Sequence, residues 1–337
     1  MNDLAHIKRL PYQFGTAITF PFRNGEGSTA FVFKSAVFYA LVMTVLFALF
    51  GKMLVGPATE YVEVLMELEN TNDEDEIMKL LTKMMRAMGG VMLPYMLIMI
   101  GGWVTWATVE AAQHRRALRD EHKGGIFPWR FKVDELLVML AHFVLYMCYM
   151  GLYFVTYIAV VLSILIAVLL GSQSTILGII GGVVATAIII ASLALMFWVL
   201  IRLAPTAALS VANKDFAIGE AWQASKGRVW PSFFAYLLVY IIGMIVIYGL
   251  LGVVGFAFVG SIISDMKAAG AGTGGAELWQ QIQEEFAKRD TQVGLVIGSF
   301  VMFLFVGFWF QIVAGINSHV ARLYKAEQSA ASVELFN

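Results

Sequence analysis

The chain has 337 residues, of which 59% are hydrophobic and 14% are charged, and its formal net charge is −1. A soluble domain of this size could not bury so much apolar surface, so the composition excludes an ordinary soluble protein. A net charge so close to zero gives no support to nucleic-acid binding.

Six apolar runs are each long enough to cross a bilayer core of about 30 Å, which takes roughly 20 residues of helix. The short alternating segments of a membrane β-barrel do not occur, so the sequence predicts an all-α membrane protein. The expected spans are about 31–55, 87–110, 136–170, 176–203, 233–263 and 293–318.

These spans define the domain organisation. We expect an N-terminal interfacial segment over 1–30, a six-helix transmembrane domain over 31–325 and a short C-terminal tail over 326–337. The first apolar run begins only near Phe31 and lacks the short apolar core and cleavage site of a signal peptide, so the first span is expected to stay in the mature protein.

The distribution of charge predicts the orientation. Most of the 23 Lys and Arg residues lie in the terminal segments and in the second and fourth connections. Because basic residues in short loops favour the cytoplasm, we predict a multi-pass protein of the bacterial inner (plasma) membrane with both termini cytoplasmic. The acidic first connection, 60–76, is interpreted as a solvated amphipathic helix, with a patch for cations or a basic partner as the alternative.

A stretch with aromatic and basic residues precedes each odd-numbered span, at 12–23, 126–135 and 216–231. Trp and Tyr favour the headgroup level, and Lys and Arg favour the anionic inner leaflet. We therefore predict three hairpins, each preceded by an interfacial segment on the cytoplasmic surface. The interfacial residues singled out are Trp129, Arg130, Trp222, Lys226, Arg228 and Trp230.

Two short motifs resemble a known group of membrane proteins. The third span opens with Phe131-Lys-Val-Asp134-Glu135-Leu-Leu, and Arg202-Leu-Ala-Pro205 leads to Glu220-Ala-Trp222-Gln-Ala-Ser225-Lys-Gly227-Arg228-Val-Trp230. They resemble bacterial six-helix membrane proteins around the membrane domain of glycerophosphoryl diester phosphodiesterases. The resemblance covers most of the chain and implies a six-helix membrane domain. The soluble phosphodiesterase domain of some relatives is not among these residues, so the resemblance implies neither phosphodiesterase activity nor catalytic residues.

Two ionisable residues lie near the inner ends of the spans, Glu110 in the second and Arg202 in the fourth. Ionisable groups at membrane depth are costly and are usually paired or solvated. One interpretation is an ion pair between Glu110 and Arg202 that closes the cytoplasmic side of the bundle. The other is that each side chain reaches interfacial water separately.

The third span carries a row of polar-tipped side chains at steps of three or four residues, which places them on one helical face. The row consists of His142, Tyr146, Tyr149, Tyr153 and Tyr157. It could line a lipid or solute pathway, or it could pack against another helix with the hydroxyls bonded across the contact. The spacing of Gly178 and Gly182 in the fourth span is typical of close helix packing.

No nucleophile elbow, zinc motif or dinucleotide fingerprint occurs in the sequence. We therefore predict a non-enzymatic protein without cofactor or metal that organises or assists a membrane process. Its expected partners are membrane lipids and a partner membrane protein, with no nucleic acid. The alternative is a transporter or permease-like protein with a polar pathway along the third span.

Overall fold

Among the residues that a computed structural model describes, six helices are long and apolar enough to cross a membrane. The structure describes residues 9–25, 27–69, 71–121, 130–172, 174–269, 284 and 288–336, and it contains no strand within them. The long helices are α2 (Ser28–Glu69), α3 (Glu74–Arg119), α4 (Val133–Gly171), α5 (Thr175–Leu203), α8 (Val229–Ala269) and α10 (Arg289–Phe336). The short helices are α1 (Phe14–Arg23), α6 (Thr206–Asn213) and α7 (Ile218–Ala224). The prediction of an all-α chain with six candidate spans is confirmed.

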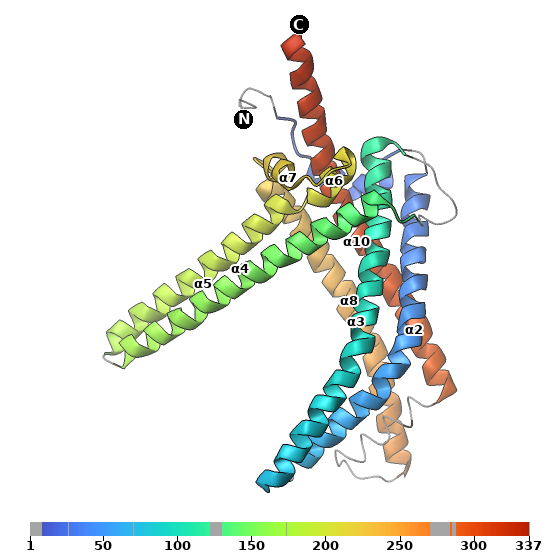
Figure 1. The fold of residues 1–337 in the computed structure, drawn as a ribbon, viewed down its shortest axis with the longest axis vertical. Helices are drawn as coiled ribbons and strands as arrows, with labels where there is room; N and C mark the ends of the chain where they lie inside the picture. The colour runs from blue at the N-terminus through green and yellow to red at the C-terminus, as the bar shows by residue number, and fades with distance from the viewer. Residues whose placement is uncertain are drawn as a thin grey trace.

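Several helices extend well beyond the predicted spans. Helix α2 continues to Glu69 and α3 begins at Glu74, so most of the acidic first connection belongs to these two helices. Asp73 caps α3 by accepting a hydrogen bond from the backbone N–H of Asp75, and acidic residues in the first turn suit the positive end of the helix dipole. Helix α10 likewise continues through the predicted tail to Phe336, and its C-terminal end projects away from the other helices (Figure 1).

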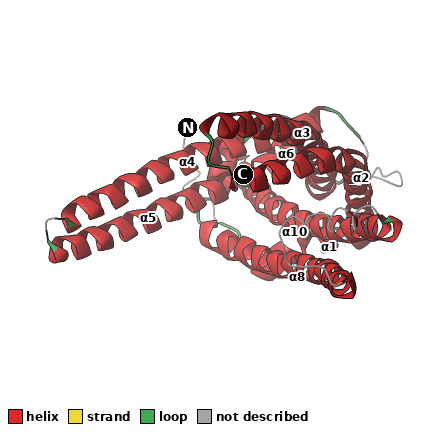
Figure 2. Ribbon diagram, turned by 90° about the horizontal axis from the view of Figure 1, so that it is seen from below, coloured by secondary structure: helices red, strands yellow, loops and turns green. Residues whose placement is uncertain are grey.

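The six long helices are not packed into a single bundle. Helix α2 packs along α3 and α10, and α8 packs along α10. Helices α4 and α5 pack along each other but point away from the rest, as Figures 1 and 2 show. We call this pair, Val133–Leu203, the α4–α5 arm. Its base contacts α3, α6, α7 and α8.

Small residues hold the two helices of the arm together. A Cβ added at Gly178 would lie 2.9 Å from the Cα of Gly171, and one added at Gly181 would lie 3.0 Å from the Cα of Ala167. Gly182 faces open space, so Gly178 makes the predicted close contact and Gly182 does not. The two backbones therefore approach closely near the tip of the arm.

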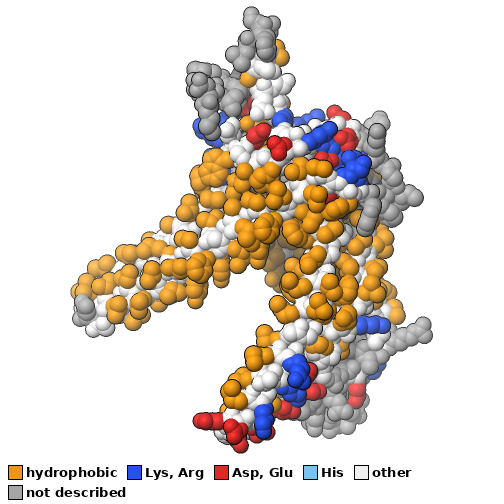
Figure 3. Space-filling model, in the orientation of Figure 1, with side chains coloured by type: hydrophobic (Ala, Val, Ile, Leu, Met, Phe, Trp, Pro, Cys, Tyr) orange, Lys and Arg blue, Asp and Glu red, His pale blue; other side chains and the backbone are white. Residues whose placement is uncertain are grey.

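Tight packing is concentrated where α1, α6 and α7 meet the long helices, which we call the α1–α6–α7 end. One apolar cluster there joins Leu209 to Val320 and Tyr324, and a second joins Ala107 to Val138. The outer arm is different, because large apolar side chains such as Val168 are mostly exposed. Figure 3 shows hydrophobic side chains covering the arm and charged side chains gathered at the two ends of the molecule. Such a distribution is typical of a surface that faces lipid.

Candidate functional site at the base of the arm

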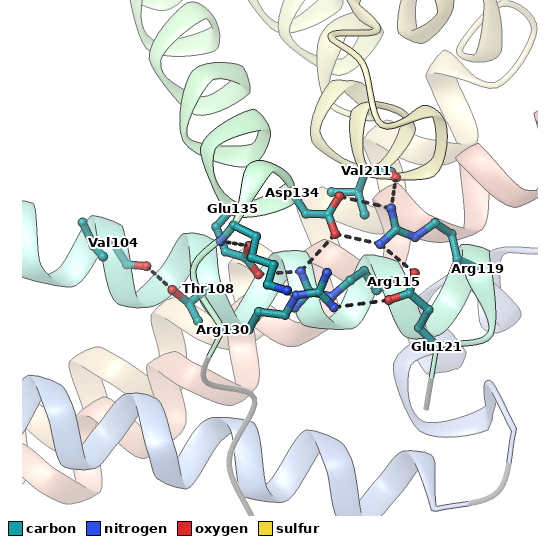
Figure 4. A network of polar contacts seen from close by, with 10 residues as sticks. Val104, Thr108, Arg115, Arg119, Glu121, Arg130, Asp134, Glu135 and Val211 are labelled. Carbon is teal, nitrogen blue, oxygen red and sulfur yellow. Dashed lines mark hydrogen bonds and ion pairs between the residues drawn. The ribbon is translucent and has the colours of Figure 1, made fainter. Parts of the chain in front are cut away.

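The arm is attached through a buried ion-pair network between α3 and α4 (Figure 4). Arg115 Nη1 donates to Glu135 Oε1 at 2.5 Å and to Asp134 Oδ2 at 3.3 Å. Arg119 Nη2 donates to Asp134 Oδ2 at 2.7 Å, and its Nη1 donates to Asp134 Oδ1 at 3.1 Å. The side chains of Arg115, Asp134 and Glu135 are at most 7% exposed. Two guanidinium groups therefore hold two carboxylates away from solvent.

The ends of the two helices favour this arrangement. Arg119 lies in the last turn of α3, and Asp134 and Glu135 lie in the first turn of α4, so each charge complements the dipole of its own helix. Glu135 also accepts a hydrogen bond from the backbone N–H of Lys132 at 2.7 Å, which closes the start of α4. Arg119 additionally donates to the carbonyl of Val211 at 3.0 Å and so joins α6 to the network.

A second buried cluster lies deeper in the helices and is centred on Glu110, whose side chain is 3% exposed. His114 Nε2 lies 3.1 Å from Glu110 Oε1, and His114 Nδ1 lies 2.8 Å from Ser318 Oγ on α10. His142 Nε2 of α4 lies 2.8 Å from Glu110 Oε2 as an ion-pair contact. Glu110 therefore links α3, α4 and α10. A carboxylate at this depth is costly unless it is paired, and the two imidazole rings are its partners.

The structure does not bring Glu110 and Arg202 together. Within the described residues Glu110 has the two histidines as partners. The Arg202 guanidinium lies over the rings of Trp222 at 4.4 Å and Trp198 at 5.3 Å. The reason is geometric, because Arg202 ends α5 and is covered by α7, whereas Glu110 faces α4 and α10. The predicted pair is replaced by a carboxylate–histidine cluster and a separate cation–π contact.

The predicted row of His142 and four tyrosines on α4 continues outward from the Glu110 cluster. Tyr146, Tyr149, Tyr153 and Tyr157 are 38–57% exposed. None of their hydroxyls bonds to a residue that the structure describes, so the interpretation as hydroxyl-bonded packing within the chain is not realised. His142 faces α3 at the base, and the tyrosines share its helical face. This face therefore borders the space between the arm and α3. We call this space the open angle, and it is visible as a hollow in Figure 3.

Methionines occupy the opposite wall of the open angle, on α3. Trp106 stacks on His142 with ring centroids 6.4 Å apart. Met99, Met92 and Met88 follow Trp106 on the same helical face and are 54%, 55% and 49% exposed. Met side chains are flexible and polarizable, and such surfaces adapt to varied partners. This wall could have been predicted, because the helical spacing of the methionines is visible in the sequence.

The predicted interfacial residues have different surroundings. Trp129 lies outside the described residues. Arg130 pairs with Glu121 at 3.5 Å, Lys226 is exposed and Trp230 is 69% exposed. Trp222 is half-buried against Arg202.

Arg228 differs from the prediction, because its side chain is buried instead of lying at a surface. It donates to the carbonyl of Ala224 and to the carboxylate of Glu327 on α10. Burial lowers the pKa of the Arg228 guanidinium, and Glu327 opposes that effect. Arg228 therefore ties the start of α8 to α10.

The buried charged groups of the site can pair charges and exchange protons. The described residues contain no group of three or more His, Cys, Asp or Glu side chains placed to hold a metal ion. Glu110, His114 and His142 can share a proton, because a carboxylate and an imidazole each have a neutral and a charged form. Comparison of the chain with protein-family models, with curated proteins and with solved structures found no match.

Proposed function

We propose that this chain is a non-enzymatic, multi-pass protein of the bacterial inner membrane that assists a membrane process by receiving a transmembrane helix of a partner protein. The helix would lie in the open angle between the α4–α5 arm and α3. The observation that carries this proposal is the exposed tyrosine row on α4, whose hydroxyls bond to no described residue.

The chemistry of the row favours a protein partner over lipid. Tyr149 lies about 24 Å along α4 from its first residue, at the depth of acyl chains. Acyl chains cannot accept or donate hydrogen bonds, and polar groups without partners are costly in hydrocarbon. A transmembrane helix with Ser, Thr or Asn side chains would meet the hydroxyls, and the flexible methionines of α3 would adapt to its other face.

The proposal also includes the orientation of the chain in the membrane. Basic residues are concentrated toward the α1–α6–α7 end, which favours the cytoplasmic side for that end and for both termini. In this orientation the six spans form three hairpins, each entered from a cytoplasmic interfacial segment, and the open angle widens toward the outer leaflet. The resemblance to the membrane domain of glycerophosphoryl diester phosphodiesterases is compatible with such a non-catalytic role.

Site-specific photo-crosslinking in cells tests the proposal. A photoreactive side chain replaces Tyr153, which faces the open angle, or Val155, which is 64% exposed and lies on the opposite face of α4. We expect the Tyr153 probe to yield one discrete adduct with a membrane protein, and the Val155 probe to yield none. Changing Tyr149 and Tyr157 to Phe should reduce that adduct, because only the hydroxyls are lost. Equal adducts from both positions, or lipid adducts alone, would contradict the proposal.

A second candidate function is transport, with a polar pathway along α4. It is favoured by the proton-sharing cluster of Glu110, His114 and His142, which stands at the inner end of the tyrosine row. Reconstitution into sealed vesicles separates the two functions. A transporter would move protons or solute across the vesicle membrane without a partner protein, and the Glu110→Gln variant would abolish that flux.

A further inference from the structure

An unpaired cationic corner forms where α5 ends against α7. The Arg202 guanidinium is held over the indole rings of Trp222 and Trp198, and its Nε is buried without a hydrogen-bond partner in the described part of the chain. The backbone carbonyl of Arg202 accepts a hydrogen bond from the Ser225 hydroxyl at 2.8 Å, which fixes α7 against the end of α5. Arg202 is therefore held in place by stacking and not by an acid.

The turn between α7 and α8 carries one further cation, Lys226, and binds a second, Arg9. Arg9 donates to the carbonyl of Lys226 and lies across Gly227. Gly227 has φ +79°, a left-handed conformation that favours glycine, and a Cβ there would lie 3.7 Å from Arg9 Cδ. Arg228 donates to the carbonyl of Leu10 at 3.5 Å, so the segment that carries Arg9 lies against this turn. The turn therefore holds like charges together.

The acids nearby are already engaged. Glu327 binds Arg228 and also accepts from the backbone N–H of Leu10, and Glu220 lies 3.8 Å from Lys325. Arg9, Arg202 and Lys226 form no ion pair with any residue that the structure describes. Holding such cations close together is unfavourable unless an anion neutralises them.

We propose that this corner binds the phosphate group of an anionic phospholipid. Arg guanidinium groups bind phosphate through paired, charge-assisted hydrogen bonds, and Lys226 adds a third cation at the exposed rim. Trp198, Trp222 and the exposed Trp230 suit the headgroup level, where their indole rings would pack on the glycerol and upper acyl region. This site is independent of the partner helix proposed above, because it uses α5, α7 and the N-terminal segment and not the face of α4.

Lipid retention by the purified full-length protein tests the site. The protein is reconstituted with phosphatidylglycerol or with phosphatidylcholine, returned to mild detergent and examined by native mass spectrometry. We expect one phosphatidylglycerol to be retained in preference to phosphatidylcholine. The double variant Arg9→Gln, Arg202→Gln should weaken retention by about 25-fold, since each cation near an anionic surface contributes about fivefold.

Two single variants complete the test, one within the corner and one outside it. Lys226→Gln changes an exposed side chain and should weaken retention by about fivefold even if the double variant does not fold. Lys34→Gln removes an exposed cation of α2, outside the corner, and should leave retention unchanged. Equal retention of both lipids, or equal loss in Lys34→Gln and Lys226→Gln, would overturn the site. If millimolar inorganic phosphate displaces the retained lipid, the corner is a phosphate site for a soluble anion. If it does not, the site belongs to the lipid.

Discussion

The base and the outer part of the α4–α5 arm are held together by opposite means. At the base, charged side chains are buried and paired, with Arg115 and Arg119 of α3 on Asp134 and Glu135 of α4. In the outer part, the backbones of α4 and α5 touch at Gly171 and Gly178, and the surrounding apolar side chains are exposed. The direction of the arm is therefore set at its base by charge, while its two helices are held together near its tip by small residues.

The largest expected effect comes from breaking the charge network at the base. Arg115→Ala leaves Glu135 buried without its guanidinium partner, and we expect a loss of about 3–5 kcal/mol in the free energy of unfolding. Steric trapping in bicelles measures this quantity. Arg130→Ala is the matched control, because its pair with Glu121 is partly exposed and should contribute at most about 1 kcal/mol. Equal losses in the two variants would show that the base is not held by buried charge.

The Glu110 cluster should rank next. Glu110→Ala leaves His114 and His142 without their carboxylate, and unpartnered buried polar groups cost about 2–3 kcal/mol together. Glu110→Gln keeps an acceptor for His114 and should lose less. Both values come from the same unfolding measurement. A Glu110→Ala variant as stable as the parent would mean that the cluster does not hold α3, α4 and α10 together.

The helical architecture could be predicted from the sequence, because long apolar runs directly indicate helices that can span a membrane. The contacts at the base were harder to predict, because they depend on how α3 and α4 cross. The sequence singles out Glu110 and Arg202 as ionisable residues that need partners, yet nothing local to either residue says that His142 contacts Glu110 and that Trp222 covers Arg202.

One part of the base could have been predicted. The second span ends in basic residues and the third begins with Asp134 and Glu135, and a connection between antiparallel helices brings such ends together. The spacing of the tyrosines along the third span places them on one helical face. The spacing alone does not say what that face borders. Only the divergence of the arm in the structure shows that it borders an open angle.

A smaller effect is expected near the tip of the arm. Gly178→Ala places a Cβ 2.9 Å from the backbone of Gly171, which must force α4 and α5 apart and should cost about 1–2 kcal/mol. Gly182→Ala is the matched control, since its Cβ would meet nothing within 4 Å and both changes alter helix propensity equally. The difference in unfolding free energy between the two variants therefore isolates the contact. No difference would show that α4 and α5 are not in close contact at this point.

The smallest effect on stability is expected on the exposed face of the arm. A variant there can change partner binding without changing the free energy of unfolding. Tyr153→Phe removes one hydroxyl that bonds to no described residue, so the free energy of unfolding should change by less than about 0.5 kcal/mol. The same change should reduce the yield of a crosslink from Tyr149 to a partner helix, because the hydroxyl is proposed to bond to that helix. A stability loss comparable to that of Glu110→Ala would show that Tyr153 is bonded within the chain. Unchanged stability together with an unchanged crosslink would contradict the role proposed for its hydroxyl, since neither folding nor binding would then use it.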